Sequence, residues 1–183
     1  CIRDRDYTAR LRNLKSMGAV VMTLALKQPL LTASHTYWLN IPAHSPDKSQ
    51  NEIPFLALVE HTNYIDSKHY GGDTIIYCGD YVPADHPYFS MSQQELQELF
   101  SGVLHKFNPE FRPDWIRKSW LFREPYAQPV PMINQSEIIP DIRTPHAGLY
   151  LASMSQVYPW DRGTNFAVEI GRRAARLMLE DMN

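Results

Sequence analysis

Residues 163–165 are of types that suit the start of a helix that binds an anion. They are Gly163, Thr164 and Asn165, and the periodic stretch "FAVEIGRRAARLML" follows them. Thr and Asn can cap a helix, and a glycine beside them lets a ligand approach the backbone. The first N–H groups of a helix, with the positive end of its dipole, attract an anion or a developing negative charge. The pattern therefore indicates a site for a negatively charged group, with an ordinary N-cap of a packed helix as the alternative.

Small residues recur every four positions along the same helix. Gly163, Ala167, Gly171 and Ala175 share one helix face, because side chains four residues apart lie above one another. A face without bulky side chains lets a backbone or a flat ligand come close. We therefore expect something to pack against this face.

Seven histidines raise the question of a metal site. Four of them, His35, His44, His61 and His69, lie in the first half of the chain. No pair has the short helical spacing that makes a zinc motif specific, and no HExxH motif is present. We predict no metal site.

Cysteine and serine chemistry are also disfavoured. Cys78 lies inside the apolar stretch "IIYCGDY", where a thiol is generally inert. The other cysteine is Cys1, and two cysteines do not make a disulfide framework, so we expect a reducing, cytoplasmic location. No Gly-x-Ser-x-Gly motif is present, which argues against acyl transfer.

The composition excludes further classes of protein. The 183-residue chain is 44% hydrophobic and 21% charged, with a formal net charge of −2. It can bury a core, and it has no long basic run that would indicate nucleic-acid binding. The longest uncharged apolar run, residues 17–26, is well short of the roughly 20 residues of a membrane-spanning helix. We expect no nucleic-acid partner and no membrane span.

Periodicity predicts the elements that must position these residues. We predict a short helix over residues 7–15 and strands over residues 19–26, 36–41, 55–62, 73–82, 115–124 and 149–152. The clearest predicted helix lies in the stretch 91–111, where Ser92 and Glu95 form a capping box at its start and Asn108 and Pro109 end it. A last helix covers residues 165–179. Strands in direct succession favour antiparallel pairing, so we predict an α+β fold with a mostly antiparallel mixed sheet flanked by helices.

The C-terminal sequence resembles a known signature. Residues 148–175, "GLYLASMSQVYPWDRGTNFAVEIGRRAA", are similar to the flavin-contacting segment of the FAD-dependent amine oxidase superfamily, which includes protoporphyrinogen oxidases and phytoene-desaturase-like enzymes. The family pattern is an apolar strand reading roughly "GLYLAGD", a variable loop, a glycine and "AVxSGxxAA". Residues 148–152 match the strand, and Gly163, Ala167, Val168 and Gly171 match the helix, together with the alanine pair at 174–175.

The resemblance implies a cofactor and the residues that contact it. FAD would lie at the start of the C-terminal helix, beside Arg162, Gly163, Thr164 and Asn165. A reduced flavin carries negative charge near its N1 atom and C2 carbonyl, which suits a helix start. The strand, turn and helix at the C-terminus would complete an FAD-binding domain.

A second segment is similar to the strand that enters the substrate cavity in this family. It is "WLFREPYAQPV", residues 120–130. The resemblance implies Tyr126, Gln128, Trp120 and Arg123 as substrate-binding residues.

The implied activity is that of a flavin-dependent oxidoreductase. Hydride would pass to FAD from an amine or from an apolar polycyclic or isoprenoid-type substrate, in a dry pocket with Trp38 and Tyr81 in its wall. The resemblance requires no dedicated base, so no catalytic residue is named.

The sequence departs from the family pattern in two places. Ser153, Met154 and Ser155 stand where the family has a glycine and an acid that orients the cofactor. The N-terminal glycine-rich FAD motif is missing, and the first residue is Cys1 rather than Met. The resemblance thus implies part of an enzyme, with a substrate-binding α+β domain over residues 1–145 and a flavin-facing strand and helix over residues 146–183.

The expected partners follow from this division. They are a small-molecule substrate and the missing N-terminal FAD-binding half or a partner chain, with FAD held by the complete protein. Apolar surface meant for that half would also allow a homo-oligomer. The alternative is a non-catalytic binding or interaction domain, either a partner subunit or a truncated product.

Overall fold

The computed structural model describes residues 2–161 and 163–182. The chain divides into two compact units, and each is described by itself. Unit 1 consists of Cys1–Ser16 and Pro129–Asn183, and unit 2 of Met17–Gln128. The functional boundary after residue 145 stays a prediction, since both sides of it belong to unit 1.

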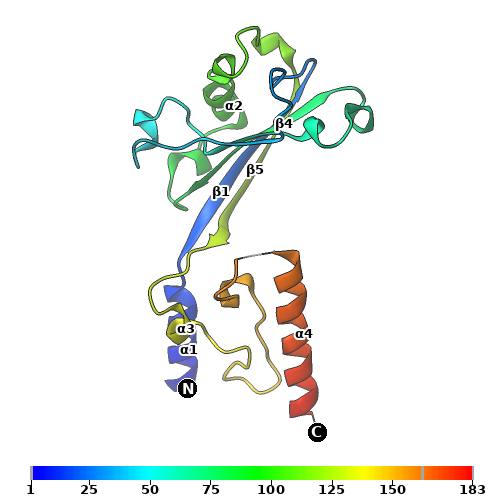
Figure 1. The fold of residues 1–183 in the computed structure, drawn as a ribbon. Helices are drawn as coiled ribbons and strands as arrows, with labels where there is room; N and C mark the ends of the chain where they lie inside the picture. The colour runs from blue at the N-terminus through cyan, green and yellow to red at the C-terminus, as the bar shows by residue number, and fades with distance from the viewer. Residues whose placement is uncertain (1, 162, 183) are drawn as a thin grey trace. The chain divides into compact units, whose positions relative to one another are not determined.

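Unit 2 is built on a five-stranded sheet (Figure 1). Its strands are β1 (Ser16–Leu26), β2 (Trp38–Asn40), β3 (Ala57–Glu60), β4 (Thr74–Val82) and β5 (Ile116–Pro129), in the spatial order β2-β3-β4-β1-β5. β1 pairs with β4, β4 with β3 and β3 with β2, all antiparallel. The predicted α+β fold with an antiparallel sheet is confirmed.

Helix α2 (Gln93–Ser101) covers one face of this sheet (Figure 1). Alternate residues of β1 point toward the covered face, because strand side chains alternate between the two faces of a sheet. These fully buried residues are Val20, Met22, Leu24 and Leu26. The apolar residues at alternate positions of 19–26 therefore bury one face of β1 in the core.

The start of α2 has the predicted capping box. The Glu95 N–H donates to Ser92 Oγ at 3.2 Å, and the Ser92 N–H donates to the Glu95 carboxylate at 2.7 Å. The helix ends at Ser101 with Gly102 as its C-cap, earlier than the predicted end at Asn108 and Pro109, and a 3-10 turn over Leu104–Lys106 follows. Glycine lowers helix stability, so it is a natural end for the regular helix.

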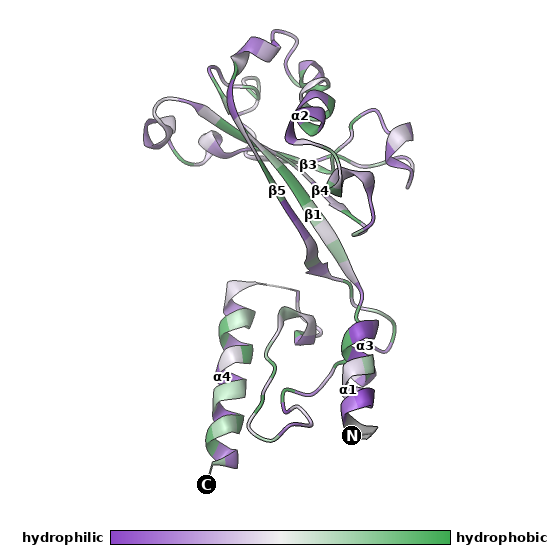
Figure 2. Ribbon diagram, turned by 180° about the vertical axis from the view of Figure 1, so that it is seen from behind, coloured by the Kyte–Doolittle hydropathy of each residue, from purple (hydrophilic) through white to green (hydrophobic). Residues whose placement is uncertain are grey.

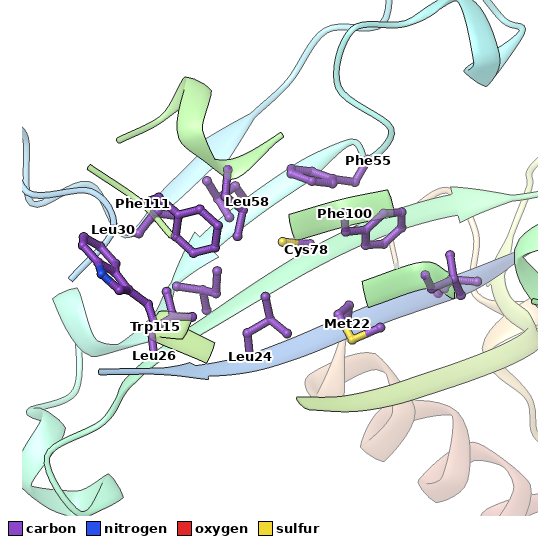
Figure 3. Close-up of a cluster of buried hydrophobic side chains, with 14 of the residues drawn as sticks. Met22, Leu24, Leu26, Leu30, Phe55, Leu58, Cys78, Phe100, Phe111 and Trp115 are labelled. Carbon is purple, nitrogen blue, oxygen red and sulfur yellow. The ribbon is translucent and has the colours of Figure 1, made fainter. Parts of the chain in front are cut away.

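The hydrophobic core of unit 2 lies between the sheet and α2. Figure 3 shows Met22 and Leu24 of β1 on the same side of the sheet as Cys78 of β4. The rings of Phe55 and Phe100 meet edge to face, with their centroids 5.3 Å apart. Such aromatic contacts add to the stabilisation from burial of apolar surface.

Two buried carboxylates bond the connecting loops to the sheet. Short 3-10 turns occur in unit 2 at Lys48–Gln50, His61–Asn63, Ser67–Tyr70, Pro87–Phe89, Leu104–Lys106 and Pro113–Trp115. Glu60, at the end of β3, accepts the Leu31 N–H at 2.5 Å. Asp80 of β4 pairs with Lys48 Nζ at 2.8 Å. Each of these buried carboxylates thus has a polar partner from a loop.

The ends of several strands differ from the predicted ones. β2 and β3 are shorter than the predicted strands over residues 36–41 and 55–62. β5 continues beyond residue 124, through Pro125, to Pro129. It lies at an edge of the sheet, where a residue without an N–H can be accommodated.

Unit 1 contains α1 (Ile2–Asn13), α3 (Gln135–Ile138), a 3-10 turn (Met154–Gln156) and α4 (Thr164–Asp181). Ile142, Ile170 and Ala174 form its small buried cluster. Asp181, at the end of α4, pairs with Arg143 at 2.8 Å and accepts the Tyr150 hydroxyl at 2.7 Å. In the part of the chain that the structure describes, no helix is both long and apolar enough to cross a membrane.

The predicted buried strand over residues 149–152 is wrong. Tyr150 makes an isolated bridge with Arg143, and the Leu151 N–H donates to the Ile142 carbonyl at 2.8 Å. Leu149 is 55% exposed. A strand needs a partner along its length, and the neighbouring irregular segment supplies a single bridge.

The core role of α2 can be tested with two substitutions in that helix. Leu96 is fully buried, whereas Leu99 is 38% exposed. We expect Leu96→Ala to lower the free energy of unfolding by about 2–5 kcal/mol, because it leaves a cavity in the core. Leu99→Ala should cost about 1 kcal/mol or less, since that side chain is largely in water already. Chemical denaturation followed by circular dichroism measures both, and equal losses would contradict this packing.

Candidate functional site

The face of the unit 2 sheet opposite α2 carries a row of small residues. In the register of the sheet, Ala57 of β3 and Val21 of β1 lie on either side of Gly79 of β4. Because side chains of one face recur at every second position, Ala19 lies on this face as well, paired with Tyr81. On this face of the sheet, Gly79 therefore has no side chain and its neighbours have small ones.

Aromatic side chains stand around this row. Trp38 of β2 and Tyr77 of β4 are the neighbours of Val59 across the sheet, and Tyr81 lies two residues beyond Gly79. Together with the small residues they line a cavity of about 320 Å³. We call it the open-face hollow, defined by Val21, Trp38, Ala57, Tyr77, Gly79 and Tyr81.

The indole ring of Trp38 is held in position by a neighbour. Trp38 Nε1–H donates to Asn40 Oδ1 at 2.7 Å. The two residues are on the same face of β2, because they are two positions apart. The ring is 53% exposed, so a large aromatic surface is oriented and still open to water.

The Tyr77 ring belongs to a group of neighbouring rings that also includes His61 and Tyr70. The His61 ring lies between Tyr70 and Tyr77, with centroid distances of 5.4 and 5.6 Å. His61 Nε2 and the Tyr70 hydroxyl are hydrogen-bonded at 2.7 Å. Burial raises the pKa of Tyr77, and nearby Tyr70 and Tyr37 raise it further. The Tyr77 hydroxyl is therefore a neutral donor and acceptor at physiological pH.

The hollow faces no ionised side chain among the described residues that line it. Asp80 contributes to the lining, but its side chain is fully buried and paired with Lys48. By the alternation along β4 this carboxylate points to the α2 side. Burial raises the pKa of Asp80, and the Lys48 ammonium opposes that shift. The hollow is thus apolar, with hydroxyl and amide groups at its edges.

Cys78 is next to Gly79 but points to the opposite face. Its side chain is fully buried in the core, as predicted. Burial strongly raises the pKa of the Cys78 thiol. The thiolate form, which is the reactive one, is therefore suppressed.

A larger cavity of about 470 Å³ lies between α2 and the loop that precedes β3. Its polar residues are already engaged in contacts within unit 2. Lys48 pairs with Asp80, Glu52 pairs with Lys106, and the Tyr88 hydroxyl donates to a backbone carbonyl at 2.8 Å. We therefore place the candidate site at the open-face hollow.

The residues predicted to bind substrate all lie on β5, but on different faces of it. Trp120 and Tyr126 are 42% and 77% exposed, and alternation places them on the same face as the hollow. Arg123 points to the other face, where it donates to the Phe89 carbonyl at 2.8 Å. Gln128 is half-buried at the end of unit 2. Their contact with a substrate stays a prediction.

The residues predicted to bind the cofactor lie in unit 1. Gly163 is the N-cap of α4 in an extended conformation, and as a glycine it has no side chain with which to cap the first turn. Thr164 and Asn165 are exposed in that turn. A Cβ atom on Gly163 would lie 2.7 Å from Asn165 Oδ1, so the space beside the helix start depends on this glycine. Arg162 lies outside the described residues.

Helix α4 has a buried and an exposed apolar face. Ile170 and Ala174 pack into unit 1, whereas Val168 and Leu179 are 56% and 63% exposed. Gly171 lies on the exposed face, and a Cβ atom there would have no described heavy atom within 4 Å. Figure 2 shows hydrophobic residues along α4, in contrast to the mainly hydrophilic α1.

Among residues 2–161 and 163–182, no three His, Cys, Asp or Glu side chains are placed to hold one metal ion. His61, one of the four histidines considered above, is engaged with Tyr70.

Comparison with known families finds no match, and no curated protein matches the chain. Solved structures do match. A protein from Exiguobacterium sp. 255-15, provisionally described as a protoporphyrinogen oxidase, is 12% identical with a TM-score of 0.65, over 94% of this chain and 37% of its own. An oxidoreductase from Methanosarcina mazei is 18% identical with a TM-score of 0.58, over 96% of this chain and 37% of its own. Reduced UDP-galactopyranose mutase is 16% identical with a TM-score of 0.54, over 74% of this chain and 27% of its own.

At such low identities the likeness establishes the fold alone. The chain has the fold of a portion of these enzymes, and it spans 37% or less of each matched chain. Two of the three are named as oxidases or oxidoreductases.

Sequence reasoning found some of the hollow and missed the rest. Trp38 and Tyr81 were expected in a substrate wall, and both line the hollow; their contact with a substrate stays a prediction. Tyr77, Gly79 and Ala57 were missed. Alternation along residues 73–82 could have placed Tyr77, Gly79 and Tyr81 on one face, but their neighbours come from strands whose register only the fold defines.

The buried carboxylate of Asp80 predicts a pH effect on stability. Because its pKa is raised in the folded state, the folded chain binds more protons than the unfolded chain between the ordinary carboxyl pKa and the raised value. The free energy of unfolding should therefore fall as pH rises through this window, and Asp80→Asn should remove that part of the fall. Urea denaturation at steps from about pH 4 to 7 measures it.

A matched control for this experiment is Asp85→Asn, which removes an exposed carboxylate from the same unit. We expect it to leave the pH dependence close to that of the unmodified chain. An Asp80→Asn variant whose pH dependence also stayed unchanged would contradict the assigned linkage.

Proposed function

We propose that this chain is the substrate-binding portion of a flavin-dependent oxidoreductase. The observation that carries the proposal is the fold, which matches nearly the whole chain to parts of an oxidase and an oxidoreductase. The open-face hollow supplies an apolar surface on which a substrate can lie. The matched proteins are all named as enzymes, so a non-catalytic binding domain is not favoured.

The residues at the start of α4 fit a flavin. The N-cap residue is a glycine, so the N-cap position itself places no side-chain acceptor on the N–H groups of the first turn, which suits an acceptor on a ligand. Gly163 keeps the approach clear, since a Cβ atom there would crowd Asn165. Gly163, Thr164 and Asn165 would hold FAD, with Arg162 as a further predicted contact. When bound, FAD supplies the acceptor for a hydride from the substrate.

The remaining residues of this chain would bind and orient the substrate. The hollow would exclude water from the reacting bond, with Trp120 and Tyr126 extending its aromatic face. Arg123 would act indirectly, because it bonds β5 to the Phe89 carbonyl. We propose an amine or an apolar ring or isoprenoid compound as substrate, and a reducing, cytoplasmic location in line with the low cysteine content.

The rest of the cofactor site would come from an FAD-binding half, in the same protein or in a partner chain. The matched enzymes are much longer than this chain. The exposed apolar face of α4, with Val168, Gly171 and Leu179, is a suitable surface for that half. Without it, copies of the chain would associate through the same face.

Flavin retention tests the proposed function. We expect flavin bands in the absorbance spectrum of the gene product that includes any residues encoded before Cys1, after FAD is added and unbound FAD removed. Gly163→Leu should lower the retained flavin about tenfold, because its side chain would occupy the helix start.

Gly171→Ala is the matched control, since it adds one methyl group to open space elsewhere on the same helix. It should retain flavin as the unmodified protein does. Absence of flavin from both the chain and the longer product would contradict the proposal.

The exposed face of α4 predicts association of the chain alone. Sedimentation velocity over a range of concentrations should show self-association that Gly171→Glu abolishes, because a charge on this face would have to be desolvated. Gly171→Ala should associate as before. A chain that stays monomeric, or a Gly171→Glu variant that associates equally, would show that this face is not the interface.

A further inference from the structure

We propose that the open-face hollow binds a flat, uncharged ring system, laid against Gly79 and bordered by Trp38, Tyr77 and Tyr81. Among the substrate classes proposed above, this inference selects the apolar ring and excludes a protonated amine, and it rests on that proposal for describing the ligand as a substrate.

The floor of the hollow is shaped for a flat surface. Gly79 has no side chain, and its neighbours on the adjacent strands, Ala57 and Val21, are small residues. A Cβ atom on Gly79 would meet Val21 Cγ2 at 3.7 Å, an ordinary contact. The fold therefore does not demand glycine here for its packing, and the space above Gly79 remains for a ligand.

The walls are rigid aromatic rings. Trp38 is oriented by the Asn40 side chain at 2.7 Å, and Tyr77 is backed by the His61 ring. Rings that are already ordered lose little entropy when a ligand covers them. The cavity volume of about 320 Å³ lies at the lower end of the range of small-molecule sites, about 300–1,000 Å³.

The charge of the hollow selects a neutral ligand. The carboxylate of Asp80 is fully buried on the other side of the sheet, where Lys48 neutralises it. A cation in the hollow would gain no carboxylate partner, and its attraction to the water-exposed faces of Trp38 and Tyr81 is too weak to offset the loss of its hydration. An anion would gain no ammonium or guanidinium. A neutral ring loses little on desolvation and gains contact with the aromatic walls.

A matched pair of dyes tests this selection on the 183-residue chain. Nile red and Nile blue share a flat fused-ring skeleton, but Nile red is neutral and Nile blue is a cation. We expect Nile red to bind with one site per chain, as measured by its fluorescence. Nile blue should bind at least about tenfold more weakly, and decanol, which is apolar but not flat, should fail to displace Nile red.

Substitutions at the floor locate the site. Gly79→Leu fills the hollow and should weaken Nile red binding about tenfold or more, whereas Gly79→Ala should change it by about threefold or less. Ala84→Leu adds three carbon atoms at an exposed loop position, one fewer than Gly79→Leu and as many as Ala57→Leu, and should have no effect. Ala57→Leu fills the floor from a second strand, so it replaces Gly79→Leu if circular dichroism shows that variant to be unfolded.

The outcomes separate this inference from the proposed function. Nile red binding that is indifferent to the floor substitutions, or Nile blue or decanol binding as tightly as Nile red, would overturn the inference even if the longer product retains flavin. Loss of Nile red binding on filling the floor, with no flavin retained by either product, would support a ring-binding site and overturn the oxidoreductase proposal alone.

Discussion

The register between β1 and β4 is the constraint on which both the core and the candidate site depend. It pairs Met22 with Cys78 on the face under α2, and it pairs Val21 with Gly79 on the opposite face. A slip of one residue would exchange the two faces, bringing Val21 into the core and Met22 into the hollow. The apolar burial that stabilises unit 2 therefore also determines which residues form the floor of the hollow.

Buried charges complement this arrangement by keeping ionised groups away from the open face. Glu60 and Asp80 lie at strand positions that point to the covered face, and each has polar partners from a connecting loop. Burial raises the pKa of both carboxyls. Their ionisation is costly, yet removing a loop partner would leave a buried carboxylate unpaired, which costs more. The hollow remains apolar because the carboxylate of Asp80, the residue after Gly79, lies on the opposite face of the sheet.

In unit 1, helix α4 has one apolar face that is packed and one that is exposed. One side of α4 packs on Ile142, and the C-terminal end of the helix is bonded to Arg143 and Tyr150. On the other side, Val168 is 56% exposed, and a Cβ atom on Gly171 would meet no described heavy atom within 4 Å. The helix therefore has one apolar face packed within unit 1 and one that is largely exposed.

The sequence by itself determined the elements that depend on local chemistry. The capping box of Ser92 and Glu95, the buried alternation of β1 and the antiparallel α+β class all follow from spacing and neighbouring residues. It also indicated Trp38 and Tyr81 as wall residues, through a resemblance. Only the tertiary structure decided that Ala57, Gly79 and Val21 meet in one row, that Arg123 faces away from Trp120, and that residues 149–152 form no strand. The reason is that side-chain periodicity is local, whereas strand pairing joins residues far apart in the chain, and its register is chosen by the burial of the whole core.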